Sequence, residues 1–103
     1  LEEVARALTG FKPKTAKYAL PSAPEKFMVL TEEENRPQPR KDAEEDGGMR
    51  ITVGRLRPCP ILDYKFISLG HNTERGAAGA SVLNAEMALA MGMLPGIEVG
   101  AVQ

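Results

Sequence analysis

The segment from Ala77 to Met91 constrains the fold more than any other, because it is apolar, contains no proline and is long enough for several helical turns. Gly92 is a typical helix stop, and Pro95 prevents the helix from continuing. Small residues fill its beginning, from Gly76 to Ser81. Thin first turns let another backbone or a ligand come close. The sequence therefore predicts a helix over 77–91 that packs tightly at its start.

Two stretches before this helix have the character of β-strands. Residues Met49–Val53 alternate apolar and polar side chains, which is typical of a half-buried strand. Residues Ile61–Leu69 contain β-branched and aromatic residues, with Asp63 and Lys65 on one face. Pro58-Cys59-Pro60 predicts a turn, so the two strands are expected to pair antiparallel across the 57–60 connection.

The N-terminal part begins with a helical pattern and continues with a stiff connector. Leu1, Val4, Ala5 and Leu8 recur at the spacing of one helix face, with Gly10 as the expected stop. Residues 12–24 contain three prolines and are expected to be extended. The short apolar run Phe27–Leu30 has the length of a buried strand.

Residues 31–48 are rich in charge and proline, and they allow two interpretations. The first is a solvated loop, because charged clusters usually stay in water. The second rests on Arg36 and Arg40, which flank Pro-Gln-Pro and would project at a fixed separation. Arginine forms paired hydrogen bonds with carboxylates, so this segment would suit contacts between subunits.

Charge and composition exclude several classes of partner. The chain has 13 basic and 14 acidic residues, without the basic excess of a nucleic-acid binder. No apolar run approaches the roughly 20 residues that span a bilayer, so we expect no membrane partner. A single cysteine cannot form an internal disulfide, which favours a reducing, cytoplasmic location. Because the chain starts without Met inside a helical pattern, we expect upstream sequence to be missing.

Three residues are candidates for chemistry. Cys59 lies between prolines rather than at a helix N-terminus, so a turn role is favoured over a nucleophilic one. His71 has no nucleophile beside it and no metal-ligand spacing, which favours an orienting or interface role over general-base catalysis. Asn72 could cap the following helix. Its amide also offers a donor and an acceptor, which would match a carboxamide such as nicotinamide.

Seven short motifs occur in an order that is similar to a known family. They are Leu20-Pro21-Ser22-Ala23-Pro24, Arg36-Pro37-Gln38-Pro39-Arg40, Gly48-Met49 with Val53-Gly54-Arg55, Asp63-Tyr64-Lys65-Phe66, His71-Asn72-Thr73, Arg75-Gly76-Ala77-Ala78-Gly79 and Leu83-Asn84-Ala85-Glu86. Together they resemble the C-terminal region of the aspartate-semialdehyde dehydrogenases of archaea, fungi and some bacteria. The resemblance covers residues 11–94.

This resemblance implies an α+β (α/β) fold: part of a catalytic domain like that of glyceraldehyde-3-phosphate dehydrogenase, with a mixed or antiparallel sheet. It implies an NADP-dependent oxidoreductase that converts L-aspartyl-4-phosphate into L-aspartate 4-semialdehyde and phosphate, on the route to Lys, Thr and Met. The partners implied are these small molecules and further subunits, in a homodimer or homotetramer. Two alternatives remain open: an acyl reductase similar to malonyl-CoA reductase, and an inactive fragment that serves only as an interaction module.

The resemblance carries few residue roles into this chain. The family's nucleophilic cysteine and its acid/base histidine lie upstream, so no residue here is expected to be catalytic and none to bind a metal. Asn72 is the residue expected to bind the cofactor, beside the nicotinamide. Residues 1–94 would form the end of the catalytic and dimerisation domain, with 95–103 as a tail. The helix over 77–91 would pack on the nucleotide domain through its Gly76–Gly79 face, and Glu74 would face solvent.

Overall fold

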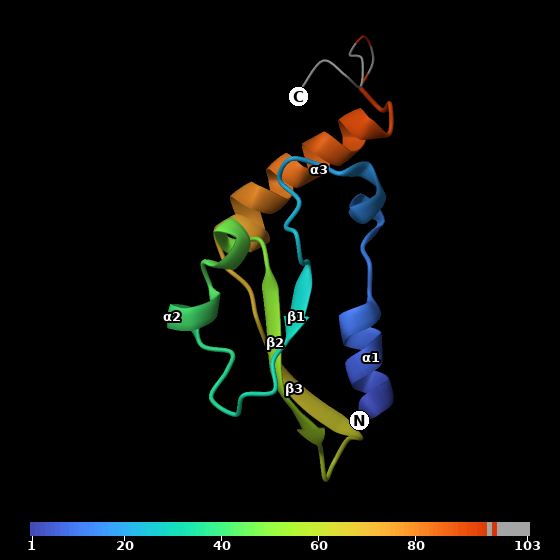
Figure 1. The fold of residues 1–103 in the computed structure, drawn as a ribbon. Coiled ribbons are helices and arrows are strands. Elements are labelled where there is room, and N and C mark those ends of the chain that lie inside the picture. Colours follow the sequence, from blue (N-terminus) through green and yellow to red (C-terminus); the bar gives the residue numbers. More distant parts are fainter. Residues whose placement is uncertain (95, 97–103) are drawn as a thin grey trace.

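The computed structural model describes residues 1–94 and 96, so the predicted tail over 95–103 lies almost entirely outside the described residues. Figure 1 shows three strands with helices on both sides and across one end. The elements, in chain order, are α1 (Glu2–Gly10), the 3₁₀ helix η1 (Lys14–Tyr18), β1 (Met28–Leu30), α2 (Pro39–Asp42), the 3₁₀ helix η2 (Glu45–Gly48), β2 (Ile51–Pro58), β3 (Tyr64–Leu69), the π-helical turn η3 (Glu74–Ala78) and α3 (Gly79–Ala90).

The three strands form one mixed sheet in the order β1-β2-β3. Strand β1 pairs parallel with β2, and β2 pairs antiparallel with β3. This confirms the predicted α+β class with a mixed sheet, as well as the antiparallel hairpin. Strand β2 continues to Pro58, so the hairpin connection is 59–63 rather than 57–60. The extension passes through an irregularity in the ladder between Gly54 and Arg57, which the alternation pattern could not predict.

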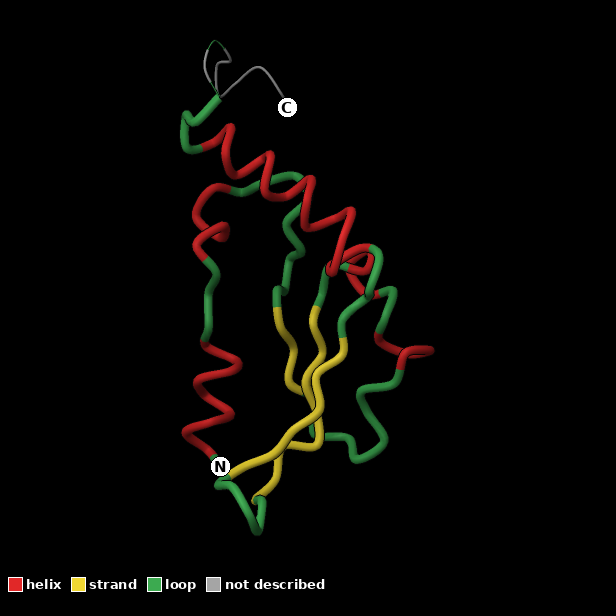
Figure 2. Tube along the Cα trace, turned by 180° about the vertical axis from the view of Figure 1, so that it is seen from behind, coloured by secondary structure: helices red, strands yellow, loops and turns green. Residues whose placement is uncertain are grey.

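The helices lie against the sheet in two places. Helix α1 packs beside β1, and α3 passes across the end of the sheet where it contacts η1 (Figures 1 and 2). The buried core there is small, and it consists of Leu20, Met49 and Leu83. Leu20 comes from the proline-rich connector, which contains η1 and is therefore not extended throughout as the sequence predicted.

The proline-rich connector is also fixed to α3 by hydrogen bonds. The backbone N–H of Ser22 donates to Glu86 Oε1 at 2.8 Å, and the Ser22 hydroxyl donates to Glu86 Oε2 at 2.5 Å. Two of the motifs identified in the sequence, 20–24 and 83–86, thus meet in space. Both carboxylate oxygens of Glu86 are occupied by this contact, which locks the connector over the helix.

The segment over 31–48 is not simply a solvated loop. It contains α2 and η2, and Asp42 within α2 is completely buried. Pro39 occupies the first turn of α2, where a missing N–H is harmless. The prediction of a fully solvated loop was therefore wrong. Inside the segment Arg36 pairs with Asp42 and Glu33, a consequence of the fold rather than of local composition.

The start of this segment crosses β2 at very close range. The backbone N–H of Thr31 donates to the Val53 carbonyl at 2.8 Å, and Arg55 Nε donates to the Glu34 carbonyl at 2.9 Å. A Cβ at Gly54 would collide with the carbonyl of Arg36. The glycine that interrupts the strand pattern is therefore the position over which the loop passes.

Candidate functional site

The turn that joins β3 to α3 is wider than an α-helical turn. The N–H of Gly76 donates to the His71 carbonyl at 2.9 Å, and the N–H of Ala78 donates to the Thr73 carbonyl at 2.8 Å. Both bonds span five residues, which defines the π-helical turn η3. The helix expected from Ala77 therefore begins at Glu74 with a π turn and becomes α-helical at Gly79. Turns of this kind often occur at functional sites.

His71 caps this turn with its imidazole ring. Its Nδ1 accepts hydrogen bonds from the backbone N–H groups of Thr73 at 3.2 Å and Glu74 at 3.1 Å. An accepting Nδ1 assigns the proton of the neutral ring to Nε2, which lies 3.5 Å from Glu44 Oε1. This geometry supports the orienting role over general-base catalysis, because the Nδ1 lone pair is already used.

Asn72 lies at the exposed outside of the same turn. The capping role considered for it is filled by His71. No described residue makes a hydrogen bond to the Asn72 side-chain amide, whose Oδ1 lies 3.8 Å from the position that a Cβ on Gly76 would take. The absence of a side chain at Gly76 thus keeps space open beside the amide. A carboxamide could use this donor and acceptor pair without breaking an internal contact.

The small residues after Asn72 divide into two groups. Gly76, Ala77 and Ala78 are exposed and leave a thin surface for another backbone. Gly79 turns inward, where a Cβ would collide with Met49 Sδ and come within 2.8 Å of the Glu74 carbonyl oxygen. The prediction that all four residues form a docking face therefore needs correction at Gly79, which serves the packing of Met49 instead.

Glu74 does not face solvent as predicted. It is half-buried, and its Cβ lies 2.9 Å from where a Cβ on Gly48 would be. Gly48 has a φ of +84°, a conformation that favours glycine. The close approach of η2 to η3 requires both the missing Cβ of Gly48 and its positive φ. The local sequence around Glu74 does not indicate this approach.

Arg75 is a residue whose role the sequence did not suggest. Its guanidinium lies over the ring of Phe27, 4.7 Å from the ring centre, just before β1. Burial lowers the pKa of Arg75, and its buried Nη1 has no hydrogen-bond partner among the described residues. The contact with Phe27 links the η3 turn to the parallel edge of the sheet. The only sign of this role in the sequence is that a single arginine precedes a run of glycine and alanine.

Arg36 and Arg40 do not project together toward another subunit. Arg36 turns inward, where its Nε donates to Asp42 Oδ1 at 3.1 Å, while Arg40 stays exposed. The N–H of Gln38 also donates to Asp42, at 2.8 Å. The hydrogen bond from Arg36 holds the pKa of Asp42 below its usual value although burial opposes this. Arg36 is therefore paired within its own chain, and of the two only Arg40 is exposed.

Cys59 lies in the hairpin connection and has no helix N-terminus beside it. Hydrogen bonds from the backbone of Leu62 and Ile61 lower the pKa of the thiol, and Leu62 N lies 3.4 Å from Sγ. This geometry agrees with the expected turn role. No group of three or more potential metal-binding side chains occurs in residues 1–94 and 96, and no described helix is long and apolar enough to cross a membrane.

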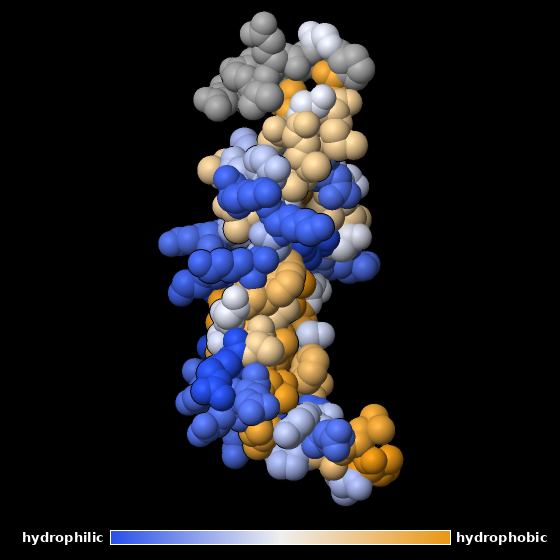
Figure 3. All heavy atoms as spheres, turned by 90° about the vertical axis from the view of Figure 1, so that its right-hand side faces the viewer, coloured by the Kyte–Doolittle hydropathy of each residue, from blue (hydrophilic) through white to orange (hydrophobic). Residues whose placement is uncertain are grey.

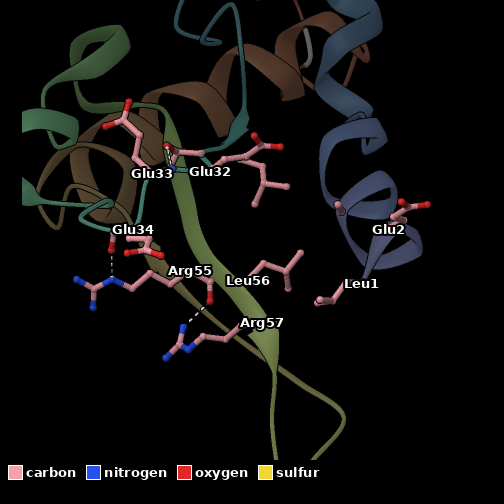
Figure 4. A pocket seen from close by; sticks show the side chains of 11 residues that line it. Leu1, Glu2, Glu32, Glu33, Glu34, Arg55, Leu56 and Arg57 are labelled. Atoms are coloured by element: carbon pink, nitrogen blue, oxygen red, sulfur yellow. Dashed lines mark hydrogen bonds between the residues drawn. The ribbon is translucent and has the colours of Figure 1, made fainter.

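Two hollows occur on the described surface. One of about 670 Å³ lies between α1 and the strands, and its lining includes Glu32, Glu33, Glu34, Arg55 and Arg57 (Figure 4). The other, of about 470 Å³, lies at the start of α3, and its lining includes Ser22, Glu74 and Gly79. Only the second adjoins the η3 turn, so the turn and this hollow together form the candidate site.

Comparison with known families places the mixed sheet and its hairpin in one class of protein. The chain belongs to the semialdehyde dehydrogenase family, because the model of the family's dimerisation domain matches residues 3–75. Within the family it is similar to aspartate-semialdehyde dehydrogenases. The enzyme of Methanothermobacter thermautotrophicus is 51% identical over 84% of this chain, and that of Trichophyton rubrum is 43% identical over 89%. The resemblance stated from the motifs is thereby confirmed.

A solved structure gives the same result. Aspartate-semialdehyde dehydrogenase from Candida albicans, determined with NADP, matches 90% of this chain with a TM-score of 0.80 and 38% sequence identity. The chain covers 26% of that protein and also 26% of each of the two relatives above. It therefore spans about a quarter of the length of the proteins that it resembles.

Proposed function

We propose that these residues serve as the C-terminal part of an aspartate-semialdehyde dehydrogenase that uses NADP. The overall reaction is the reduction of L-aspartyl-4-phosphate by NADPH to L-aspartate 4-semialdehyde, NADP⁺ and phosphate. The observation that carries the proposal is the exposed Asn72 amide, which has no partner among the described residues and lies in a turn of the expected family motif. The similarity to the NADP-bound Candida albicans enzyme supports the choice of cofactor.

Asn72 would bind the carboxamide of the nicotinamide ring through one donated and one accepted hydrogen bond. The bound NADPH would supply the hydride. The residues of this chain would hold the ring in place: His71 fixes the turn by capping it, and Gly76 leaves room beside the amide. A defined position of the reacting groups contributes to catalysis because it lowers the entropic part of the barrier.

The remaining surfaces fit the same proposal. Residues 1–94 would complete the catalytic and dimerisation domain, and the thin face of Gly76, Ala77 and Ala78 would contact the nucleotide domain. Small residues permit such an approach because they keep the helix backbone accessible. The nucleophilic cysteine would come from outside these residues, since Cys59 lies in a hairpin connection away from the η3 turn.

Activity is expected only when these residues are joined to a nucleotide domain and a nucleophile. The test is a chimera in which they replace the matching C-terminal segment of the Methanothermobacter thermautotrophicus relative. We expect phosphate-dependent formation of NADPH from aspartate semialdehyde by the chimera, and none by the 103-residue chain alone. A chimera that folds, as judged by circular dichroism, but lacks this activity would contradict the proposal. So would turnover by the isolated chain.

Within the chimera, replacing Asn72 with alanine is expected to raise the KM for NADP or to lower kcat by several-fold. One hydrogen bond between neutral groups is worth about 0.5–1.5 kcal/mol, which sets this range. Asn72→Asp keeps the size of the side chain but removes the donor, so it should show a similar defect. Asn35→Ala removes another exposed amide and serves as the control. The assignment fails if Asn72→Ala leaves both constants at the values of the Asn35→Ala control.

A further inference from the structure

His71 holds the turn around Asn72 with its backbone and with its side chain. Its Nδ1 accepts hydrogen bonds from the backbone N–H groups of Thr73 at 3.2 Å and Glu74 at 3.1 Å. Its carbonyl accepts from the N–H of Gly76 at 2.9 Å. Asn72 is exposed and lies within the turn that these bonds close. The backbone that carries the Asn72 amide is therefore fixed by hydrogen bonds to a single residue.

The cap formed by His71 requires a neutral ring whose proton is on Nε2. In this tautomer Nδ1 is an acceptor, whereas an imidazolium carries a proton on both nitrogens. A protonated Nδ1 would face two backbone N–H groups that also donate. The Thr73 hydroxyl, whose Oγ1 lies 3.2 Å from Nδ1, can turn to accept a proton, but a backbone N–H cannot. Protonation of the ring therefore removes both hydrogen bonds from the backbone to Nδ1.

Two carboxylates lie close to the ring and attract a positive charge there. Glu44 Oε1 is 3.5 Å from Nε2 of His71, and the side chain of Glu74 lies beside Gly48, as the ring does. The His71 side chain is 23% exposed, so it can exchange protons with solvent. Two influences therefore oppose each other. The backbone donors stabilise the neutral ring, and the carboxylates stabilise the imidazolium.

The other charged groups around the turn are paired or point elsewhere within the described residues. Glu45 and Asp46 of η2 pair with Arg50, and Arg75 of η3 lies over the ring of Phe27. Exposed apolar side chains gather at the hairpin end of the molecule, which lies at the other end of β3 (Figure 3). The charge of the His71 ring therefore depends chiefly on the two nearby carboxylates and the two backbone donors.

We infer that His71 is a positioning residue that couples the binding of NADP to pH. While the ring is neutral, the cap holds Asn72 where the nicotinamide carboxamide can bind. Uptake of a proton from solvent at Nδ1 releases the turn, so the amide loses its fixed position and the cofactor binds more weakly in mild acid. This inference rests on the proposed function, because it needs the contact between Asn72 and the cofactor. It adds a pH dependence that Asn72 cannot provide, since an amide does not titrate.

The test measures the dissociation constant of NADP⁺ for the active chimera by calorimetry, from about pH 7.5 to about pH 5.5, a range in which imidazole side chains change their charge. The matched variant is His71→Asn, whose side-chain oxygen can accept from the same N–H groups but takes up no proton. The phosphate of NADP⁺ and groups elsewhere in the chimera titrate in both proteins. The readout is therefore the ratio of the dissociation constant of the parent to that of the variant.

We expect this ratio to rise about fivefold towards the acid end of the range. This corresponds to about 1 kcal/mol, the usual contribution of one hydrogen bond. A ratio that does not change with pH would overturn the inference, and it would leave the proposed contact of Asn72 with the cofactor in place.

Amide hydrogen exchange of the chimera tests the cap without any cofactor. After correction for the intrinsic effect of pH on exchange, protection of the Thr73 and Glu74 amides should fall in the parent over the same range and stay constant in His71→Asn. His71→Ala lacks the acceptor and should show low protection throughout. Constant protection in the parent would overturn the inference. Protection that falls as expected, together with an Asn72→Ala variant that binds NADP⁺ like the parent, would reject the proposed function and with it the coupling to the cofactor.

Discussion

Replacing Asp42 with alanine is expected to lower the free energy of unfolding by about 3 kcal/mol, at the lower end of the range for breaking a buried ion pair. Asp42 is completely buried, and it accepts hydrogen bonds from Arg36 and from the backbone of Gln38. The alanine variant leaves these donors without their acceptor. We expect a loss of unfolding free energy at the lower end of this range because the Arg36 side chain is 26% exposed. Water can therefore partly replace the carboxylate as a partner of the guanidinium.

Urea-induced unfolding of the purified protein measures this change, and Asp42→Asn should lie between the parent and Asp42→Ala because the amide keeps one acceptor. Asp63→Ala is the matched control, since Asp63 is an exposed aspartate in the hairpin connection. Its effect should stay within about 0.5 kcal/mol. Equal effects of Asp42→Ala and Asp63→Ala would mean that the buried pair does not stabilise the fold.

The same carboxylate predicts a pH dependence. Because Arg36 lowers the pKa of Asp42 in the folded state, folding is favoured by ionisation of Asp42. This contribution is fully present above the pKa of an aspartate in the unfolded chain, at about 3.9. It is lost as the pH falls through the lower pKa of the folded state. The difference in stability between the parent and Asp42→Ala should therefore shrink in acid, and a constant difference would contradict the assignment.

The sequence predicted those parts of the fold that depend on neighbours along the chain. The alternation in Met49–Val53, the β-branched residues of Ile61–Leu69 and the apolar stretch before Gly92 each predicted an element of the correct type. The motifs predicted the family and the junction at 71–79. These signals succeed because side-chain periodicity and helix stops are local properties.

The errors concern contacts between segments or the choice between adjacent residues. The charge of residues 31–48 predicted that the whole segment is exposed to solvent. Asp42 is nevertheless buried, because its carboxylate is paired with the Arg36 guanidinium. Asn72 and His71 are both able to cap a turn, and only the backbone geometry of the π turn decides for His71. The inward position of Gly79 depends on Met49, which lies 30 residues earlier in the chain. No local pattern contains this information.

Gly54→Ala is expected to lower the free energy of unfolding by about 1–3 kcal/mol, the usual range for overpacking a filled interior. The added methyl group would collide with the Arg36 carbonyl and lie 2.8 Å from Cδ of Pro37. A backbone carbonyl cannot turn aside as a flexible side chain could, so the loop itself must move away from β2. That movement would also disturb the hydrogen bond from Thr31 to Val53 and the placement of Arg36.

The control for this variant is Gly70→Ala, because a Cβ at Gly70 meets nothing within 4 Å. It follows β3 directly, and its φ is not one that excludes alanine. The same chemical change should therefore alter stability by no more than about 0.5 kcal/mol at Gly70. In Gly54→Ala, the amide of Thr31 should also exchange faster with solvent, since the loop is displaced. Equal stability of the two variants would show that the loop does not pack closely against Gly54. It would also contradict the explanation given for the glycine in the strand pattern.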